Sequence, residues 1–112
     1  MSGHQPRFAT TPDPPYIAVI FSSQRAGDHE GYEAMSALMV KLSMAHDGCL
    51  GAESTRDSEG FGITVSYWTT EQAVADWKAD SQHQIAQRLG RERWYEDYQI
   101  RIATVTRAYA SF

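Results

Sequence analysis

The apolar residues of this chain switch between strand-like and helix-like spacing in an order that few folds accommodate. Strand-like runs cover residues 16–21, 49–56, 61–68 and 98–109, and helix-like regions cover residues 28–45 and 69–90. A turn of suitable composition (DSEG, residues 57–60) separates the two middle strands and predicts a hairpin. The predicted order is therefore strand, helix, strand, strand, helix, strand.

The two helical regions carry different terminal signals. In the first, apolar residues recur at helical spacing from Tyr32 to Leu42, and Gly48 is placed to end the helix in a left-handed cap. The second contains two capping-box patterns, at residues 69–72 (TTEQ) and 81–84 (SQHQ). The repeated pattern predicts a break near Asp80, after which Ser81 would cap a second segment.

This order of elements predicts an α+β, ferredoxin-like βαββαβ split sheet with two helices on one face. The other face of the sheet would be bare. Both alternating sets of the first strand are apolar, with Ile17 and Val19 on one side and Ala18 and Ile20 on the other. At 112 residues the chain is one small domain, so we expect a homodimer in which two sheets pack face to face.

The first fifteen residues contain all four prolines and show little periodicity. We expect residues 1–15 to form an extended or mobile arm, and residues 16–112 to form the domain.

Composition excludes several classes of partner. Ten Lys and Arg residues against fourteen Asp and Glu residues give a net charge of -4, and no basic cluster occurs, so we expect no nucleic-acid partner. No segment resembles a signal peptide or a membrane span, and the single cysteine, Cys49, cannot form an internal disulfide. We therefore expect a cytoplasmic protein in which Cys49 is a partly buried core residue.

The four histidines lack the spacing of a metal site, so we expect no bound metal. His29 and His46 fall at the two ends of the first helical region, and His4 falls in the arm. We expect these three side chains to face solvent.

Two runs, residues 51–57 (GAESTRD) and 62–68 (GITVSYW), together with a set of later residues, resemble the antibiotic biosynthesis monooxygenase (ABM) family. The later residues are Trp77, His83, Ala86, Gln87, Gly90, Arg91, Trp94 and Tyr95. The resemblance extends over residues 16–109 and implies a dimeric α/β barrel with a small-molecule pocket between the helices and the sheet of each subunit. The family includes cofactor-free oxygenases, heme-degrading enzymes and members without a known reaction, so the resemblance leaves the chemistry open.

The heme-degrading branch can be compared residue by residue. Those enzymes use an asparagine on the first strand, a tryptophan on the second helix and an iron-binding histidine ten residues after the tryptophan. An alignment without gaps places Ile20, Trp77 and Gln87 at these positions. Only the tryptophan matches, and His83, six residues after Trp77, would point elsewhere on an unbroken helix. We therefore expect no heme and no other cofactor.

The cofactor-free branch requires an electron-rich phenolic or enolic substrate, an apolar pocket and a group that accepts a proton. His83 is the candidate base or hydrogen-bond partner, because an imidazole of pKa about 6.5 exchanges protons near neutral pH; alternatively it is an ordinary surface residue. Candidate pocket residues are Trp77, Tyr67, Trp68, Tyr32, Arg91 and Tyr95.

Each pocket candidate also has a structural alternative. Trp77 and Tyr32 suit core packing. Arg91 suits a salt bridge, and Tyr95 suits a contact with the partner subunit. Tyr67 and Trp68 are adjacent on a strand and must face opposite sides, so only one of them can meet the helices.

Two functions of different classes follow. The first is a cofactor-independent monooxygenase that oxidises a small electron-rich aromatic or polyketide-like compound with O2. The second is a non-catalytic dimeric module that binds a small apolar or aromatic molecule. A heme-degrading or heme-binding relative is the less favoured third reading.

Overall fold

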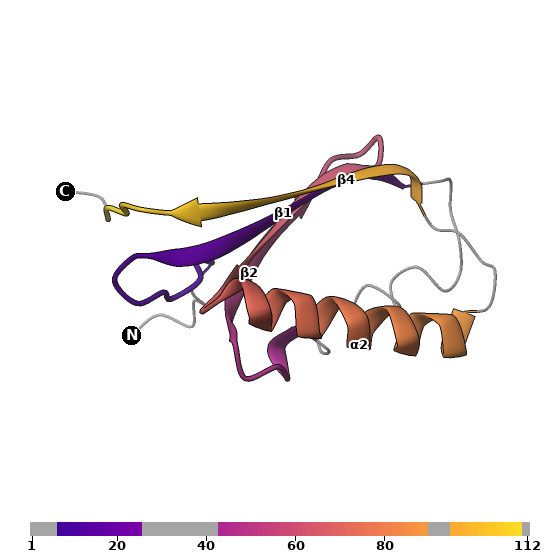
Figure 1. Ribbon diagram of the computed structural model, residues 1–112. Helices are drawn as coiled ribbons and strands as arrows, with labels where there is room; N and C mark the ends of the chain where they lie inside the picture. Colours follow the sequence, from indigo (N-terminus) through magenta and orange to yellow (C-terminus); the bar gives the residue numbers. More distant parts are fainter. Residues whose placement is uncertain (1–6, 26–42, 90–94, 111–112) are drawn as a thin grey trace, which may run out of the picture.

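The structure, a computed structural model, describes residues 7–25, 43–89 and 95–110 of the 112, and for residues 25, 81–89 and 95–97 it describes the backbone alone. Its elements are β1 (Tyr16–Arg25), β2 (Cys49–Arg56), β3 (Phe61–Trp68), α2 (Glu71–Leu89) and β4 (Tyr95–Val105) (Figure 1). Of the first predicted helix, residues 43 and 44 are helical, and residues 28–42 lie outside the described residues.

The four strands form one antiparallel sheet in the order β2-β3-β1-β4. β1 is central and pairs with β3 on one side and β4 on the other, so that Ile17 lies opposite both Trp68 and Thr104. This order, together with a helix between β3 and β4, confirms the predicted α+β ferredoxin-like fold.

The hairpin between β2 and β3 forms where the sequence predicts it. The Asp57 carboxylate accepts hydrogen bonds from the backbone N–H groups of Glu59 and Phe61, at 2.9 and 3.0 Å. Gly60 adopts a φ of 93°, which glycine tolerates better than other residues. Because the turn is fixed by its own side chain, both flanking strands have the predicted bounds.

The outer bounds of β1 and β4 differ from the prediction. β1 continues from Phe21 to Arg25, and β4 begins at Tyr95 and ends at Val105 instead of spanning residues 98–109. Arg25 pairs with Tyr95 across the two strands. Backbone pairing therefore extends the ladder beyond the segment in which apolar side chains alternate.

α2 is one continuous helix of 19 residues, which corrects the predicted break near Asp80 and the predicted cap at Ser81. No glycine or proline occurs between Glu71 and Leu89, and a serine can occupy a helix interior at small cost. The N-terminal cap is also shifted by one residue from the predicted Thr69. The Ala73 N–H donates to the Thr70 hydroxyl oxygen at 3.1 Å.

Gly48 does not form the predicted left-handed cap, because its φ is not positive. Gly48 instead lets the segment that precedes β2 approach α2 closely. A Cβ at this position would overlap with the Cβ of Ala73. Thr69 donates its N–H to the Gly48 carbonyl at 2.9 Å, which fixes this approach.

The core lies between α2 and one face of the sheet, along which α2 runs in Figure 1. Its buried members are Ile17, Val19, Trp68 and Val74, and Cys49, Ala73 and Trp77 pack against them. Cys49 is partly buried, as expected, and burial raises the pKa of its thiol. A protonated thiol is a poor nucleophile, so Cys49 fits a core role.

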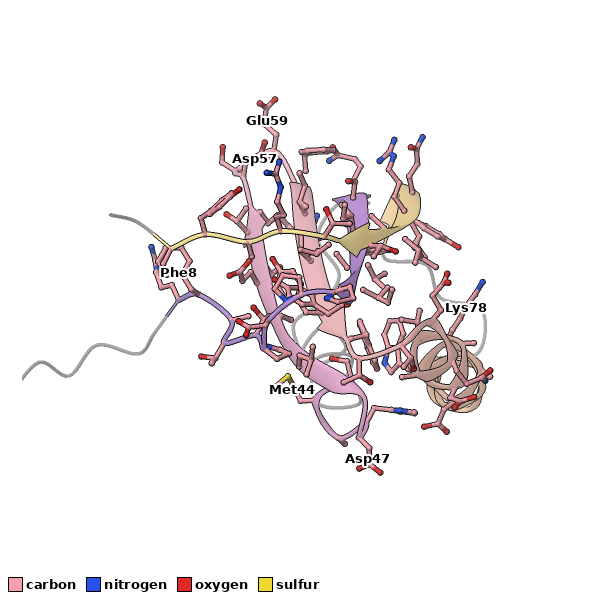
Figure 2. The ribbon with its side chains drawn as sticks, turned by 60° about the vertical axis from the view of Figure 1, so that its left-hand side comes forward. Phe8, Met44, Asp47, Asp57, Glu59 and Lys78 are labelled. Carbon is pink, nitrogen blue, oxygen red and sulfur yellow. The ribbon has the colours of Figure 1, made fainter. Side chains whose placement is uncertain are left out.

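The face opposite α2 is not bare. Residues 7–15 form neither helix nor strand, but they lie against this face, where the Ala9 N–H donates to the Glu53 carboxylate at 2.9 Å. Figure 2 shows Phe8, in this segment, and Lys78, on α2, on opposite sides of the strands. Among the described residues, α2 therefore covers part of one face of the sheet, and the N-terminal segment covers part of the other.

Candidate functional site

The structure separates the two adjacent aromatic residues at the end of β3. Trp68 faces α2 and is fully buried, with 0% of its surface exposed. Tyr67 lies on the opposite face, where its hydroxyl donates to Glu53 at 2.8 Å. Of this pair, Trp68 is the one that meets the helix, and Tyr67 cannot line the same pocket as Trp77.

Trp68 and Trp77 form the centre of the α2-facing side. Their ring centroids lie 5.2 Å apart at an interplanar angle of 40°. Trp68 donates its indole N–H to the Ser66 hydroxyl at 2.9 Å, so its polar atom is satisfied within the sheet.

The indole nitrogen of Trp77 is different. Nε1 is buried, yet it has no hydrogen-bond acceptor among the residues that the structure describes. A buried N–H without an acceptor costs about 1–3 kcal/mol relative to a satisfied one. This donor therefore suits the oxygen or nitrogen atom of a bound molecule.

An exposed apolar strip lies on the same side of the sheet, along β4. Tyr98, Ile100 and Ile102 expose 57%, 49% and 52% of their surfaces. Ile100 and Ile102 pair with Phe21 and Val19 of β1, so the strip continues the apolar surface of the core. The rings of Phe21 and Tyr98 pack at 5.6 Å. The strip offers a wall for an apolar molecule.

The surroundings of Tyr67 favour the protonated form of its phenol. Burial, the hydrogen bond to Glu53 and the charge of that carboxylate raise the pKa of Tyr67 to about 12. A phenol with this pKa acts as a donor and not as a base at neutral pH. The Tyr67–Glu53 pair therefore has a structural role on the face away from Trp77.

Several predicted site residues lie outside the described residues in whole or in part. Tyr32 and Arg91 are outside them entirely, and for His83 and Tyr95 only the backbone is described. His83 lies in α2, six residues after Trp77.

The structure shows which way the side chain aligned with the asparagine of heme-degrading enzymes faces. Ile20, the residue aligned with the asparagine of heme-degrading enzymes, pairs with Val65 and Arg101 and alternates with core residues. It therefore faces away from α2. Its neighbours Val19 and Phe21 face α2, and neither is an asparagine. The asparagine is therefore missing whether the alignment uses Ile20 or one of its two neighbours.

A hollow of about 530 Å³ lies at the N-terminus of α2. It is lined by Ala45, His46, Asp47, Gly48, Thr69, Thr70, Gln72, Ala73 and Asp76. His46, expected to face solvent, is half-buried, with its ring 6.0 Å from that of Trp68. The hollow is open and polar, which does not match an apolar substrate.

The described residues contain no group of three or more His, Cys, Asp or Glu side chains that could hold a metal ion. Within the same part of the chain, no helix is both long and apolar enough to cross a membrane.

Two site features escaped the sequence reasoning. The sequence gives no signal that the Trp77 nitrogen lacks an acceptor among the described residues, because the fold decides which acceptors lie near it. The strip on β4 had a signal, namely the alternation of Tyr98, Ile100 and Ile102. That alternation indicated a strand but not that α2 would leave the strand uncovered.

The sequence is similar to a known protein family and to one bacterial protein. The family model described as antibiotic biosynthesis monooxygenase matches residues 15–89. The uncharacterized protein YqjZ of Bacillus subtilis (strain 168) is 46% identical over 97 residues, which cover 87% of this chain and 85% of that protein.

Solved structures share the fold at low identity. SnoaB, a cofactor-independent oxygenase from Streptomyces nogalater, matches as a mutant with a TM-score of 0.68 and 13% identity, over 86% of this chain and 98% of that one. A mutant of MhuD with two manganese protoporphyrin IX molecules bound per active site matches with a TM-score of 0.68 and 15% identity, over 85% and 99%. The family match over most of the chain shows that it belongs to the antibiotic biosynthesis monooxygenase family.

Proposed function

We propose that this protein is a cofactor-independent monooxygenase that oxidises a small electron-rich aromatic or polyketide-like compound with O2. The observation that carries the proposal is the buried Trp77 N–H, which has no acceptor among the described residues and lies on the same face of the sheet as exposed apolar side chains. An apolar site with one directed donor suits a flat ring that carries one oxygen atom. Membership of the family and the likeness to SnoaB support this reading.

The substrate supplies the electrons in this chemistry. A ring CH2 group next to a phenol or enol loses a proton, and the resulting anion reacts with O2. One oxygen atom becomes a ketone, and the other leaves as water with the two hydrogens of the CH2 group. The protein holds the ring against the β4 strip, and the Trp77 N–H stabilises negative charge on the substrate oxygen. His83 is our candidate for the group that accepts the proton.

The Trp77→Phe variant tests the donor. Phenylalanine keeps an aromatic ring in the core and removes the N–H, so turnover should fall by about 10²–10³-fold, the usual effect of losing one oxyanion donor. The control is Lys78→Gln, which changes the exposed residue next to Trp77 on α2 and should keep turnover within about threefold of the unsubstituted protein.

The measurement is oxygen uptake with a panel of anthrones and hydroquinones, together with thermal melts of each variant. Equal turnover in the unsubstituted protein and folded Trp77→Phe would remove the indole N–H from the mechanism.

A non-catalytic binding module is the second candidate. The same Trp77 donor favours it, because a bound molecule would satisfy the N–H without any reaction. Saturable quenching of tryptophan fluorescence by an anthraquinone, without oxygen uptake for any reduced ring in the panel, would favour this module over the enzyme.

The proposal includes a homodimer in the cytoplasm. Ile63 and Phe61 expose 38% and 47% of their surfaces on the face opposite α2, which supports packing of that face against a second copy. The single cysteine is consistent with a reducing compartment.

A further inference from the structure

One row of side chains crosses the α2 face of the sheet from a polar edge to an apolar edge. Across β2, β3, β1 and β4, the paired residues of this row are Ser54, Thr64, Phe21 and Ile100. The row shares the face of Trp68, because Thr64 lies four residues before Trp68 on β3 and side chains alternate along a strand. It therefore belongs to the wall of the candidate site.

The polar end of the row is a pair of hydroxyls. The side-chain oxygens of Ser54 and Thr64 lie 2.7 Å apart, so that one hydroxyl donates to the other. Two hydroxyls carry two O–H groups, and one donor remains after this bond. Among the described residues neither hydroxyl has a further partner, and Ser54 is exposed while Thr64 is half-buried. The remaining O–H is therefore available to a bound molecule.

Two other hydroxyls on this face are already used. Ser66 accepts the indole N–H of Trp68 at 2.9 Å. Ser23 accepts a guanidinium N–H of Arg56 at 2.9 Å and exposes only 2% of its surface. Neither of these serines offers a substrate what the Ser54–Thr64 pair offers.

The position of the pair sets the size of molecule that it can meet. Trp77 packs on Trp68, and Thr64 lies about 13 Å from Trp68 along β3. Two or three fused six-membered rings have a length of this order. Between the two ends, Phe21 and the exposed Ile100 supply apolar contact for such rings.

We propose that the Ser54–Thr64 pair makes the site selective for ring compounds with a second oxygen substituent, a hydroxyl or carbonyl group, remote from the oxygen held by the Trp77 N–H. The inference rests on the substrate site of the proposed function. The pair donates its remaining O–H to the second substituent while the rings lie over the apolar end of the row. Because water solvates these hydroxyls in the free protein, selection takes the form of a preference between related compounds.

Two anthraquinones that differ in one hydroxyl measure this preference. Quenching of tryptophan fluorescence gives the Kd of anthraquinone and of 2-hydroxyanthraquinone, at a pH below the pKa of the added phenol. The unsubstituted protein should bind the hydroxylated compound about three- to tenfold more tightly, the usual effect of one hydrogen bond. The double variant Ser54→Ala with Thr64→Val lacks both hydroxyls and should bind the two compounds equally.

The matched control is Thr55→Val. Thr55 follows Ser54 on β2, so its exposed side chain lies on the opposite face, and its loss should leave the preference unchanged. Thr64→Ser keeps a hydroxyl and should also keep the preference. Equal Kd values in the unsubstituted protein, or an undiminished preference in a double variant that melts as a folded protein, would overturn the selection.

Oxygen uptake with anthrone and 2-hydroxyanthrone separates this selection from the proposed oxidation. A preference in kcat/KM for the hydroxylated ring, lost in the double variant, would support both. Uptake with neither compound, together with the expected Kd values, would refute the oxidation and leave the selection standing. Uptake with both at equal kcat/KM, before and after the double substitution, would refute the selection and leave the oxidation standing.

Discussion

The Tyr67 phenol shows how one side chain can report on its surroundings. Its pKa is raised from 10.0 to about 12, first by burial and then by its hydrogen bond to Glu53. Sequence analysis could name Tyr67 as an aromatic residue near the end of a strand. It could not give the face, because the choice between Tyr67 and Trp68 depends on which side α2 covers.

We predict an alkaline stability change with a definite sign. Between pH 10 and about 12 the unfolded state loses the Tyr67 proton while the folded state keeps it, so the free energy of unfolding falls as pH rises. Below pH 10 both states hold the proton and this contribution is constant. Phenolate absorbance should show one tyrosine titrating near 12, absent in Tyr67→Phe.

Glu53→Gln removes the negative charge and should lower the pKa of Tyr67 toward its ordinary value, whereas Glu59→Gln should not change it. Identical titration curves for the unsubstituted protein and Glu53→Gln would contradict the assigned role of Glu53.

At the scale of elements, local chemistry decided which bounds were predictable. β2 and β3 were predicted to the residue because Asp57 and Gly60 fix the turn between them. The start of β4 was not, because it depends on pairing with Arg25 across the sheet. The start of α2 was missed by one residue for a similar reason. The N–H of Thr69 is already bonded to Gly48, so the helix begins after Thr70.

The position of the α2 cap can be tested with two adjacent threonines. Thr70→Ala removes the hydroxyl that accepts the Ala73 N–H and should lower the free energy of unfolding by about 1 kcal/mol. Thr69→Ala keeps this bond and should cost less than about 0.5 kcal/mol. Urea unfolding followed by circular dichroism measures both, and a larger loss for Thr69→Ala would place the cap where the sequence pattern put it.

At the scale of the whole molecule, the order of elements was enough to predict the sheet, because few connections join such elements without crossing. The packing of residues 7–15 against the sheet was not predictable. This proline-rich segment lacks periodicity, and Glu53, which accepts the Ala9 N–H, lies 44 residues from Ala9. Trp77 was named as a candidate from the sequence, but the lack of an acceptor for its nitrogen among the described residues depends on the folded surroundings.

Isotope labelling is the decisive test of the proposed oxidation by O2 without a cofactor. Protein dialysed against a chelator and free of flavin and heme absorbance is incubated with an anthrone under ¹⁸O2, and the quinone is analysed by mass spectrometry. We expect one ¹⁸O atom in each product molecule, and product formation well above the rate without protein. Product formation no faster than in buffer, or only after a flavin, heme or metal is added, would contradict it.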